Sequence, residues 1–329
     1  MSEGEDMNER LPRSLQGLLR MTAQQAREQG TPSQFEEMSE ERRKFLEEAI
    51  SSFSEDTYVK RMLKCLEVLS KEDVEDDDDD SKEMAFEDLD SMVDLIDNAN
   101  DLHKIGGFPI VVRYLHHNQS ELRWRSADLI AVLSQNNPYC QTHLNSLGVI
   151  PVLLQLLDND TVDQVRIKAL YALSSMTSNF PEGKTVFLDN DGLSSLVRAL
   201  QAKISKVRIK SSSMLRSMIS ESLLSEDSTI KEALVNMGIV EQLVSLLHEQ
   251  HELFHEFIAD SLAILSENLP KVVQECQRPQ LQLEKILHER IHELEKEDKE
   301  AFETEIECYK RLLAQCFGNT AYEMDSSLR

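Results

Sequence analysis

Two histidine pairs in this chain have the spacing of a zinc hydrolase motif. Residues 251–255 read His-Glu-Leu-Phe-His, and residues 288–292 read His-Glu-Arg-Ile-His. In H-E-x-x-H, two imidazoles one helical turn apart hold zinc and the glutamate takes a proton from the bound water. The first pair spans a predicted loop and the start of a helix, so its rings need not share a face. The second pair lacks a specified third ligand, and we expect no metal site; a zinc hydrolase using His288 and His292 is the remote alternative.

Other short motifs also fail to complete a catalytic site. Gly183-Lys184-Thr185 resembles the end of a phosphate-binding loop, but Ser178 stands where the leading glycine is required and no strand precedes it. No Ser/His/Asp or Cys/His arrangement has a recognisable local signature. The cysteines are odd in number and include no C-x-x-C, so we expect reduced thiols. We therefore predict no catalytic residue, no cofactor and no enzymatic activity.

Pairs of cationic residues recur along the chain at intervals of 43 and 42 positions. The first member of each pair is predicted to be structural and to pair locally with loop acids such as Asp163. The second member lies three residues before a position that should share its helix face. The pairs are Arg123/Arg125, Arg166/Lys168 and Arg208/Lys210. The candidate binding residues are Arg125, Lys168, Lys210, the face positions Asp128, Tyr171 and Ser213, and the equivalent Asp260.

Composition excludes several classes of partner. The 329 residues include 35 Lys and Arg against 60 Asp and Glu, a formal net charge of −25. Such an anionic chain is repelled by nucleic acid and by acidic lipid, since both are held by cationic side chains. The sequence has no run of about 18 apolar residues, and its first twenty residues carry charges. We expect no nucleic acid or membrane partner and a soluble, cytosolic monomer.

The elements that position these residues are predicted to be helices. Only 5% of the residues are aromatic and only 10 are glycine, which is poor in the residue types that sheets and their turns need. A segment of ten or eleven residues, with a glycine near its start and a final leucine, occurs four times. A longer helical pattern follows each copy, with apolar positions at Ile130, Leu173, Leu215 and Leu262 and at Leu133, Met176, Met218 and Leu265. The copies are residues 105–115, 147–157, 191–200 and 237–247, and their glycines Gly107, Gly148, Gly192 and Gly238 are 41, 44 and 46 positions apart.

Each repeat unit therefore predicts three helices. A short helix ends at the glycine, where a left-handed turn costs little, and a second and a longer third helix follow. None of them can bury its apolar stripe alone, so the units must stack into a solenoid whose third helices line a concave surface. A period of about 42 residues with three helices favours armadillo over HEAT repeats. The predicted fold is all-α: a right-handed armadillo-like solenoid with four central repeats and flanking helices at both ends.

Composition also divides the chain into segments. The N-terminal residues have too few large apolar side chains for a core and are predicted to be mostly disordered, apart from a leucine-rich island at 11–20. Eight acids within residues 72–80 predict a solvated loop, with binding of cations or basic partners as the alternative. The predicted segments are 1–38 with the leucine island, 39–83 with two helices followed by the acidic loop, 84–278 with the armadillo-like repeats, and 279–329 as a C-terminal helical cap with helices over 281–298 and 300–317.

The face of the third helices lacks one known peptide-binding pattern. Armadillo proteins that hold extended basic peptides resemble one another in a Trp and an Asn four residues apart on each third helix. The corresponding positions here are Asp128/Val132, Tyr171/Ser175, Ser213/Ser217 and Asp260/Ile264. The missing pattern weakens a nuclear-import or catenin-like function. Because Asp128 and Asp260 are acidic, a generic armadillo scaffold or transport adaptor is still an alternative.

Taken together, motifs along nearly the full chain resemble one family. These are Leu15-Gln16-Gly17-Leu18-Leu19, the segment 38–43, the segment 92–100, Leu122-Arg123-Trp124-Arg125 with Ser134-Gln135-Asn136, the segment 165–170 and Phe254-His255-Glu256. Their order and spacing resemble the 70-kDa heat shock protein binding proteins, which are armadillo-type nucleotide exchange factors. The chain departs from animal members in lacking a long Gly/Ser-rich N-terminus and in its aspartate run at 76–80.

The resemblance implies a cochaperone. The concave face would embrace the nucleotide-binding domain of the 70-kDa heat shock chaperone and promote the release of ADP and then of the client. Asn98 and Ala99, within the segment 92–100, join the candidates for this face. The leucine island, through Leu15, Leu18 and Leu19, would mimic a client peptide; a fragment of amphipathic helix docked on the body is the alternative.

Overall fold

Helices make up the part of the chain that this computed structural model describes, which is residues 58–71, 79–224 and 229–318. These residues all belong to one unit, Thr57–Arg329. The leucine island and the predicted helix around residues 45–53 lie outside the described residues, as does most of the acidic run.

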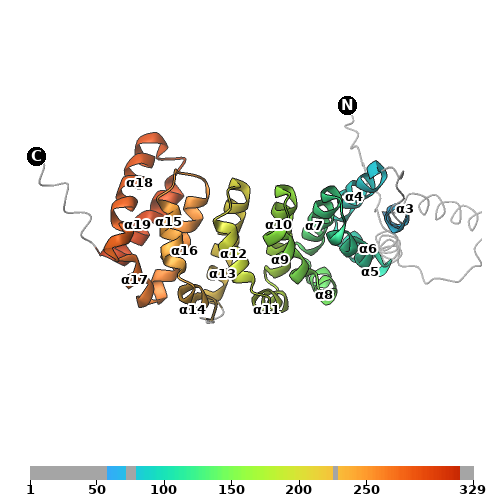
Figure 1. Cartoon of the computed structure of the whole chain (residues 1–329), viewed down its shortest axis with the longest axis horizontal. Helices are drawn as coiled ribbons and strands as arrows, with labels where there is room; N and C mark the ends of the chain where they lie inside the picture. Colours follow the sequence, from blue (N-terminus) through green and yellow to red (C-terminus); the bar gives the residue numbers. More distant parts are fainter. Residues whose placement is uncertain (1–57, 72–78, 225–228, 319–329) are drawn as a thin grey trace, which may run out of the picture. The chain divides into compact units, whose positions relative to one another are not determined.

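Four successive units within residues 96–268 have the same order of three helices (Figure 1). The first helices are α5 (Ile96–Lys104), α8 (Pro138–Ser146), α11 (Pro181–Asp189) and α14 (Thr229–Asn236). The second helices are α6 (Gly107–Arg113, continued by the 3-10 turn η1, Tyr114–His116), α9 (Val149–Asn159), α12 (Gly192–Leu200) and α15 (Ile239–Leu247). The third helices are α7 (Ser120–Ser134), α10 (Asp163–Thr177), α13 (Ser205–Leu224) and α16 (Phe254–Asn268). The predicted all-α armadillo-like solenoid is confirmed.

Flanking helices extend the stack at both ends of the four units. Before them lie α3 (Tyr58–Ser70) and α4 (Asp79–Val93), and after them lie α17 (Pro270–Cys276), the 3-10 turn η2 (Pro279–Leu281), α18 (Leu283–Asp298) and α19 (Glu303–Phe317). The predicted acidic loop over residues 72–80 is too long at its C-terminal end, because its last two residues, Asp79 and Asp80, begin α4. Acidic residues are favoured in the first turn of a helix, where the positive end of the helix dipole lies.

The turn between the first and second helices depends on a residue with positive φ. In two of the four units this residue is the one before the predicted glycine. Gly148 and Gly238 have φ of +71°, as predicted, but in the other units Gly106 (+83°) and Asp191 (+59°) take the left-handed conformation. Gly107 and Gly192 instead begin the second helices. A Cβ at Gly192 would lie 2.6 Å from the ring of Phe187, so this glycine is required for close packing of the first helix on the second.

The third helices form the interior of the stack. Consecutive members of the row α4, α7, α10, α13, α16 and α19 pack on one another. All eight apolar positions predicted from the repeat are buried, which removes one side of each third helix from water. Among the apolar residues of α3, Met62, Leu66 and Leu69 are buried and Leu63 is exposed. No helix of the described residues is both long enough and apolar enough to cross a membrane.

Candidate functional site

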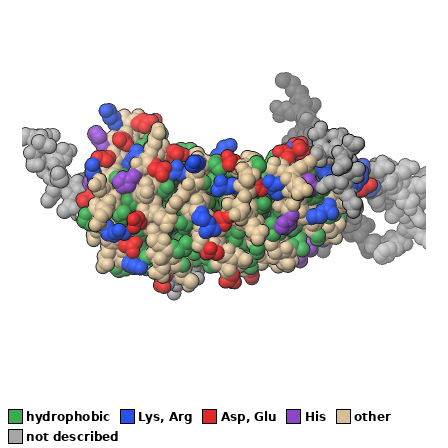
Figure 2. All heavy atoms as spheres, in the orientation of Figure 1, with side chains coloured by type: hydrophobic (Ala, Val, Ile, Leu, Met, Phe, Trp, Pro, Cys, Tyr) green, Lys and Arg blue, Asp and Glu red, His purple; other side chains and the backbone are tan. Residues whose placement is uncertain are grey.

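The predicted binding residues of the repeated third helices lie along one face of the row that these helices form. We call this surface the third-helix face; it is formed by the exposed positions of α4, α7, α10, α13, α16 and α19. Most of the cationic side chains along it pair with an acidic side chain of a neighbouring helix. Figure 2 shows the same mixing of the two signs on the side of the molecule in view, with no large patch of either sign. The pairs between successive helices define the electrostatics of the face.

The N-terminal end of the third-helix face is held by Arg125 of α7. Its guanidinium lies 3.0 Å from a carboxylate oxygen of Glu87 and 3.4 Å from one of Glu83, both on α4. A third acid, Glu121, lies 3.1 Å away on the same helix, and the guanidinium lies 4.7 Å from the centre of the Trp124 ring. The Arg125 charge is therefore satisfied by groups of this chain and connects α4 to α7.

The next contact joins α7 to α10. Lys168 Nζ lies 2.6 Å from Asp128 Oδ2, and both side chains are partly exposed. The same ammonium lies 5.8 Å from the centre of the Trp124 ring. Lys168 and Asp128 thus neutralise each other at the surface. A partner that binds either charge must first break this ion pair.

Lys210 of α13 differs from the other two cations. No carboxylate of the described residues lies within 4.0 Å of its ammonium, which instead lies 4.7 Å from the centre of the Tyr171 ring. Burial lowers the pKa of Lys210, because removal of water disfavours the charged form. Tyr171 is 46% exposed, and Ser213, one turn after Lys210, is partly exposed. A desolvated cation and an exposed aromatic ring therefore occupy the middle of the face.

At the C-terminal end of the face, Asp260 of α16 lies between two arginines. It pairs with Arg216 of α13 on one side and with Arg311 of α19 on the other. The carboxylate is buried while both arginines are about half exposed. Asp260 was predicted from the sequence, whereas neither arginine was. Arg311 lies outside the repeat pattern, 51 positions from its partner, so no local signal marks it.

Asn98 and Ala99 do not lie on the third-helix face. Both belong to the first helix α5 and are buried. The side chain of Asn98 donates a hydrogen bond to the Met92 carbonyl at 2.7 Å, which anchors the chain between α4 and α5. The structure therefore assigns these two residues to the interior. Leu15, Leu18 and Leu19 lie outside the described residues.

The first members of the cationic pairs are structural, as predicted, but their predicted local partner Asp163 is wrong. Arg123 forms a two-pronged contact with Asp160 at 2.7 and 3.0 Å, and Arg208 lies 2.7 Å from Glu249. Both acids belong to the following repeat, about 40 residues on. Arg166 instead donates to the Leu157 carbonyl at 3.0 Å. Stacking of the repeats places acids that are distant in sequence nearer to Arg123 and Arg208 than the acids close to them in sequence.

The first histidine pair has a structural role in this fold, whereas the second lies at the surface. The rings of His251 and His255 are stacked, with centres 5.4 Å apart. His255 is buried, and its ring nitrogens face the backbone: Nε2 the Leu246 carbonyl and Nδ1 the backbone of Glu252. The second pair, His288 and His292, is exposed on α18. Within the described ranges, no group of three or more His, Cys, Asp and Glu is placed to hold a metal ion.

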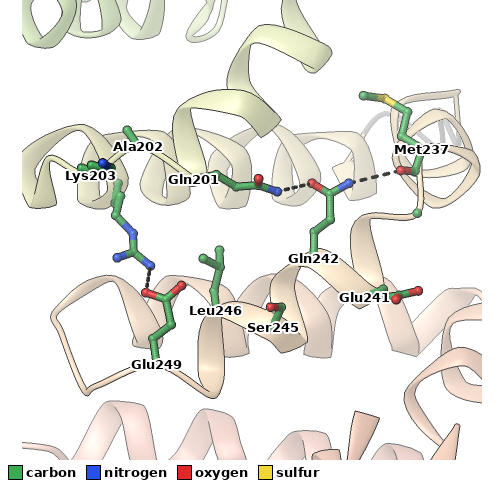
Figure 3. Close-up of a pocket in the computed structure, with 11 residues that line it drawn as sticks. Gln201, Ala202, Lys203, Met237, Glu241, Gln242, Ser245, Leu246 and Glu249 are labelled. Carbon is green, nitrogen blue, oxygen red and sulfur yellow. Dashed lines mark hydrogen bonds and ion pairs between the residues drawn. The ribbon is translucent and has the colours of Figure 1, made fainter. Parts of the chain in front are cut away.

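A separate hollow lies between the second helices α12 and α15 (Figure 3). Its volume is about 730 Å³, and Gln201 and Gln242 are joined across it by a hydrogen bond of 2.9 Å. Arg208 and Glu249 close one side through their ion pair. None of the predicted binding residues lines this hollow, so it is distinct from the third-helix face.

Solved structures define the class to which this fold belongs. A designed armadillo repeat protein matches 77% of this chain and 98% of its own chain, with a TM-score of 0.60 and 18% identity. A second designed armadillo repeat protein, solved in complex with the peptide (KR)4, matches 76% and 98% with a TM-score of 0.60 and 17% identity. These likenesses, together with the helix order above, define an armadillo-repeat protein.

Sequence relatives define the family more narrowly. The family described as "SIL1/FES1/HPBP1 C-terminal domain" matches residues 98–314 and "Nucleotide exchange factor Fes1" matches residues 15–102. The chain belongs to this SIL1/FES1/HPBP1 family. It is 38% identical to Hsp70-binding protein 1 of Rattus norvegicus over 95% of this chain and 88% of the relative. It is 30% identical to the Hsp70 nucleotide exchange factor FES1 of Scheffersomyces stipitis over 50% of this chain and 58% of the relative.

Proposed function

We propose that this chain is a nucleotide exchange factor for the 70-kDa heat shock chaperone (Hsp70). The observation that carries the proposal is the 38% identity to Hsp70-binding protein 1 over nearly the whole chain. The match of the N-terminal part to the nucleotide exchange factor Fes1 supports it independently. The chain would act by binding, as a cochaperone, without making or breaking a covalent bond itself.

In this proposal the third-helix face binds the nucleotide-binding domain of the chaperone. The protein would bind the open arrangement of that domain more tightly than the closed arrangement that holds ADP. Only this difference in affinity can shift the population toward the open arrangement. ADP would then leave, ATP would enter, and the chaperone would release its client. A hundredfold faster loss of ADP requires the barrier to fall by about 2.7 kcal/mol, which a few interface contacts can supply.

Within the face, we assign the main role in binding to Lys210 and Tyr171. Arg125, Lys168 and Asp260 are paired within the chain, so a partner must compete with those pairs. Lys210 has lost part of its hydration without gaining a carboxylate. An acidic side chain of the chaperone placed beside it would gain a charge contact at little further desolvation cost. The exposed Tyr171 ring would pack beside that contact, and aromatic residues are enriched among binding hot spots.

The alternative function is a generic armadillo scaffold or transport adaptor for basic peptides. It depends on free acidic groups at Asp128 and Asp260. Because Lys168 neutralises Asp128 and two arginines neutralise Asp260, the face offers little free negative charge at these positions. The nucleotide exchange function is therefore the better supported of the two.

Three further parts of the proposal rest on the sequence. The segment with Leu15, Leu18 and Leu19 would occupy the client site of the chaperone and so assist client release. The chain would act as a monomer, and it would act in the cytosol. Light scattering of the purified chain at micromolar concentration tests the monomeric state.

A stopped-flow experiment tests the function and the site together. Labelled ADP is preloaded on the chaperone, and its release is followed after mixing with excess ATP and this protein. The wild-type chain is expected to accelerate release at micromolar concentration. Lys210→Glu should lower the affinity for the chaperone at least tenfold, which corresponds to about 1.4 kcal/mol. The reason is that the new carboxylate would lie beside the acidic side chain of the chaperone that we propose Lys210 contacts.

Lys203→Glu is the matched control, since it makes the same charge change at an exposed lysine that lies beside the α12–α15 hollow. Circular dichroism should show equal helicity for both variants. No acceleration by the wild-type chain would refute the exchange function. Equal acceleration by Lys210→Glu and Lys203→Glu would refute the assigned face but leave the exchange function standing.

A further inference from the structure

A second, smaller hollow lies between the ends of the second helices α9 and α12. Its volume is about 420 Å³. It is lined by the last three residues of α9, by Arg166 of α10, and by Arg198 and Ala199 of α12. None of the predicted binding residues of the third-helix face lines it, so the two surfaces are distinct.

Arg166 is a cation of this hollow that the chain does not pair with an acid. Its Nε donates a hydrogen bond to the Leu157 carbonyl at 3.0 Å. No carboxylate of the described residues lies within 4.0 Å of its guanidinium, and its terminal nitrogens donate no hydrogen bond to any described residue. The side chain is partly exposed. The guanidinium of Arg166 therefore keeps most of its N–H donors unused.

The equivalent arginines of the neighbouring repeats are both paired with a carboxylate from the repeat that follows. Arg123 contacts Asp160, which lies directly after α9, at 2.7 and 3.0 Å. Arg208 contacts Glu249, two residues after the end of α15, at 2.7 Å. For Arg166 the corresponding residue, directly after α12, is the uncharged Gln201.

Neither Gln201 nor Asp160 satisfies Arg166. The side-chain amide of Gln201 donates a hydrogen bond of 2.9 Å to Gln242, across the α12–α15 hollow (Figure 3). Asp160 interacts with Arg166 through its charge, but both of its carboxylate oxygens accept hydrogen bonds from Arg123. Arg166 therefore lacks the carboxylate that this chain supplies to its two equivalents.

The charges around the hollow favour an anionic group, although the whole chain carries a formal charge of −25. Asp158 is its one acidic lining residue, and Arg198 holds the two oxygens of that carboxylate at 2.7 and 3.2 Å. The Ser195 hydroxyl also donates to Asp158 at 2.7 Å. Two guanidinium groups thus accompany one carboxylate that is already paired. The planar fork of a guanidinium binds a carboxylate through two parallel hydrogen bonds.

We propose that this hollow binds an acidic segment of a partner protein, with one Glu or Asp carboxylate seated on the terminal nitrogens of Arg166. That carboxylate would contact Arg166 as Asp160 contacts Arg123. Arg198, whose side chain is 56% exposed, would attract a further acidic side chain of the same segment. The site lies outside the third-helix face, so the proposal does not depend on the exchange function.

Fluorescence polarisation with the full-length chain and a labelled hexaglutamate peptide tests the proposal. The wild-type chain is expected to bind this peptide, whereas a hexaglutamine peptide with the same label should not bind. Arg166→Gln should weaken binding about fivefold, the loss expected for one well-formed ion pair near the surface.

Gln201→Glu is a second variant that leaves Arg166 and its contact with the Leu157 carbonyl in place. It should also weaken binding about fivefold, because the new carboxylate would contact Arg166 as Asp160 contacts Arg123. This variant tests the site without removing the backbone contact that Arg166 makes.

Arg278→Gln is the matched control, since it removes the same charge at an exposed arginine outside the hollow that is paired with Glu241. It should leave the affinity for hexaglutamate within about twofold. The proposal is overturned if the wild-type chain does not bind hexaglutamate, or if Arg166→Gln and Gln201→Glu both bind it as tightly as the wild type. Equal weakening by Arg278→Gln and Arg166→Gln would also overturn it, because binding would then depend on net charge alone.

Discussion

Lys168 and Lys210 occupy the same position of successive third helices, yet their surroundings differ. Lys168 lies 2.6 Å from Asp128, whereas Lys210 contacts the ring of Tyr171. The residue that decides the difference lies on the preceding helix, where α7 has an aspartate and α10 has a tyrosine. A repeated cation is therefore a structural link in one unit and a candidate binding group in the next.

A second residue-scale feature is Asp90 of α4, whose Oδ1 is buried without a hydrogen bond. Burial raises its pKa, and the nearby Asp128 and Asp94 raise it further. The folded state therefore holds the Asp90 proton more tightly than the unfolded state does. This contribution favours folding below the pKa of the unfolded carboxyl, about 3.9, and is lost as the pH rises through the raised pKa.

We predict that Asp90→Asn stabilises the protein at pH 7, because the amide removes the buried charge. The gain in the free energy of unfolding should shrink as the pH falls toward 4, where the wild-type carboxyl is increasingly protonated. Urea unfolding at pH 7 and pH 4 measures both values. Asp88→Asn, at an exposed position of the same helix, is the control and should show a smaller pH-dependent difference. A wild-type chain more stable than Asp90→Asn at pH 7 would contradict the argument.

At the scale of elements, two kinds of glycine shape the turn between the first and second helices. Gly148 supplies a positive φ, and nothing lies within 4 Å of the position where its Cβ would be. Gly192 has ordinary helical geometry, but a Cβ there would meet the Phe187 ring at 2.6 Å. Neighbouring glycines of the same motif are thus required for different reasons, backbone conformation in one case and close packing in the other.

We predict that Gly148→Ala and Gly192→Ala both destabilise the fold, and that asparagine at each of the two positions separates the causes. Gly148→Ala should cost about 1 kcal/mol from left-handed strain, and Gly192→Ala about 1–3 kcal/mol from overpacking. Asn tolerates positive φ better than Ala does, so Gly148→Asn should recover part of the loss while Gly192→Asn should not. Urea denaturation followed by circular dichroism measures all four values. Recovery by asparagine at both positions would refute the distinction.

At the scale of the whole described unit, each repeat buries its apolar side chains against the next repeat. The last helix of the row, α19, packs on α16 with Ile306, Leu312 and Leu313 buried. Its other side carries charged residues such as Glu307 and Lys310. Terminal repeats of a solenoid need such a polar outer side, since the stack otherwise ends in an apolar surface.

We predict that a chain ending at Gln277 aggregates, because loss of α18 and α19 exposes the apolar side of α16. Size-exclusion chromatography with light scattering should show large species instead of a single sharp peak. A chain ending at Gly318 keeps every described helix and serves as the control, with the elution and helicity of the full chain. A monodisperse, fully helical product from the shorter truncation would show that α16 can end the stack by itself.

Local patterns in the sequence are sufficient to predict the helices and their core. The positions of Leu173 and Met176, for example, hold an apolar residue in every unit, because each unit buries these positions of its third helix against its neighbours. The left-handed turn was misplaced by one position at Gly107 and Gly192, because two adjacent residues satisfy the same pattern. Periodicity does not reveal which of them carries the positive φ.

The sequence by itself determined that this is a helical repeat protein with a recurring pair of cationic positions, and its motifs carried the family resemblance. Only the tertiary structure decided which charges are already paired, such as Asp260 between Arg216 and Arg311, or Arg123 with Asp160. The physical reason is distance along the chain. Helix formation and burial are set by residues within a few turns, whereas these pairs are set by how whole repeats stack.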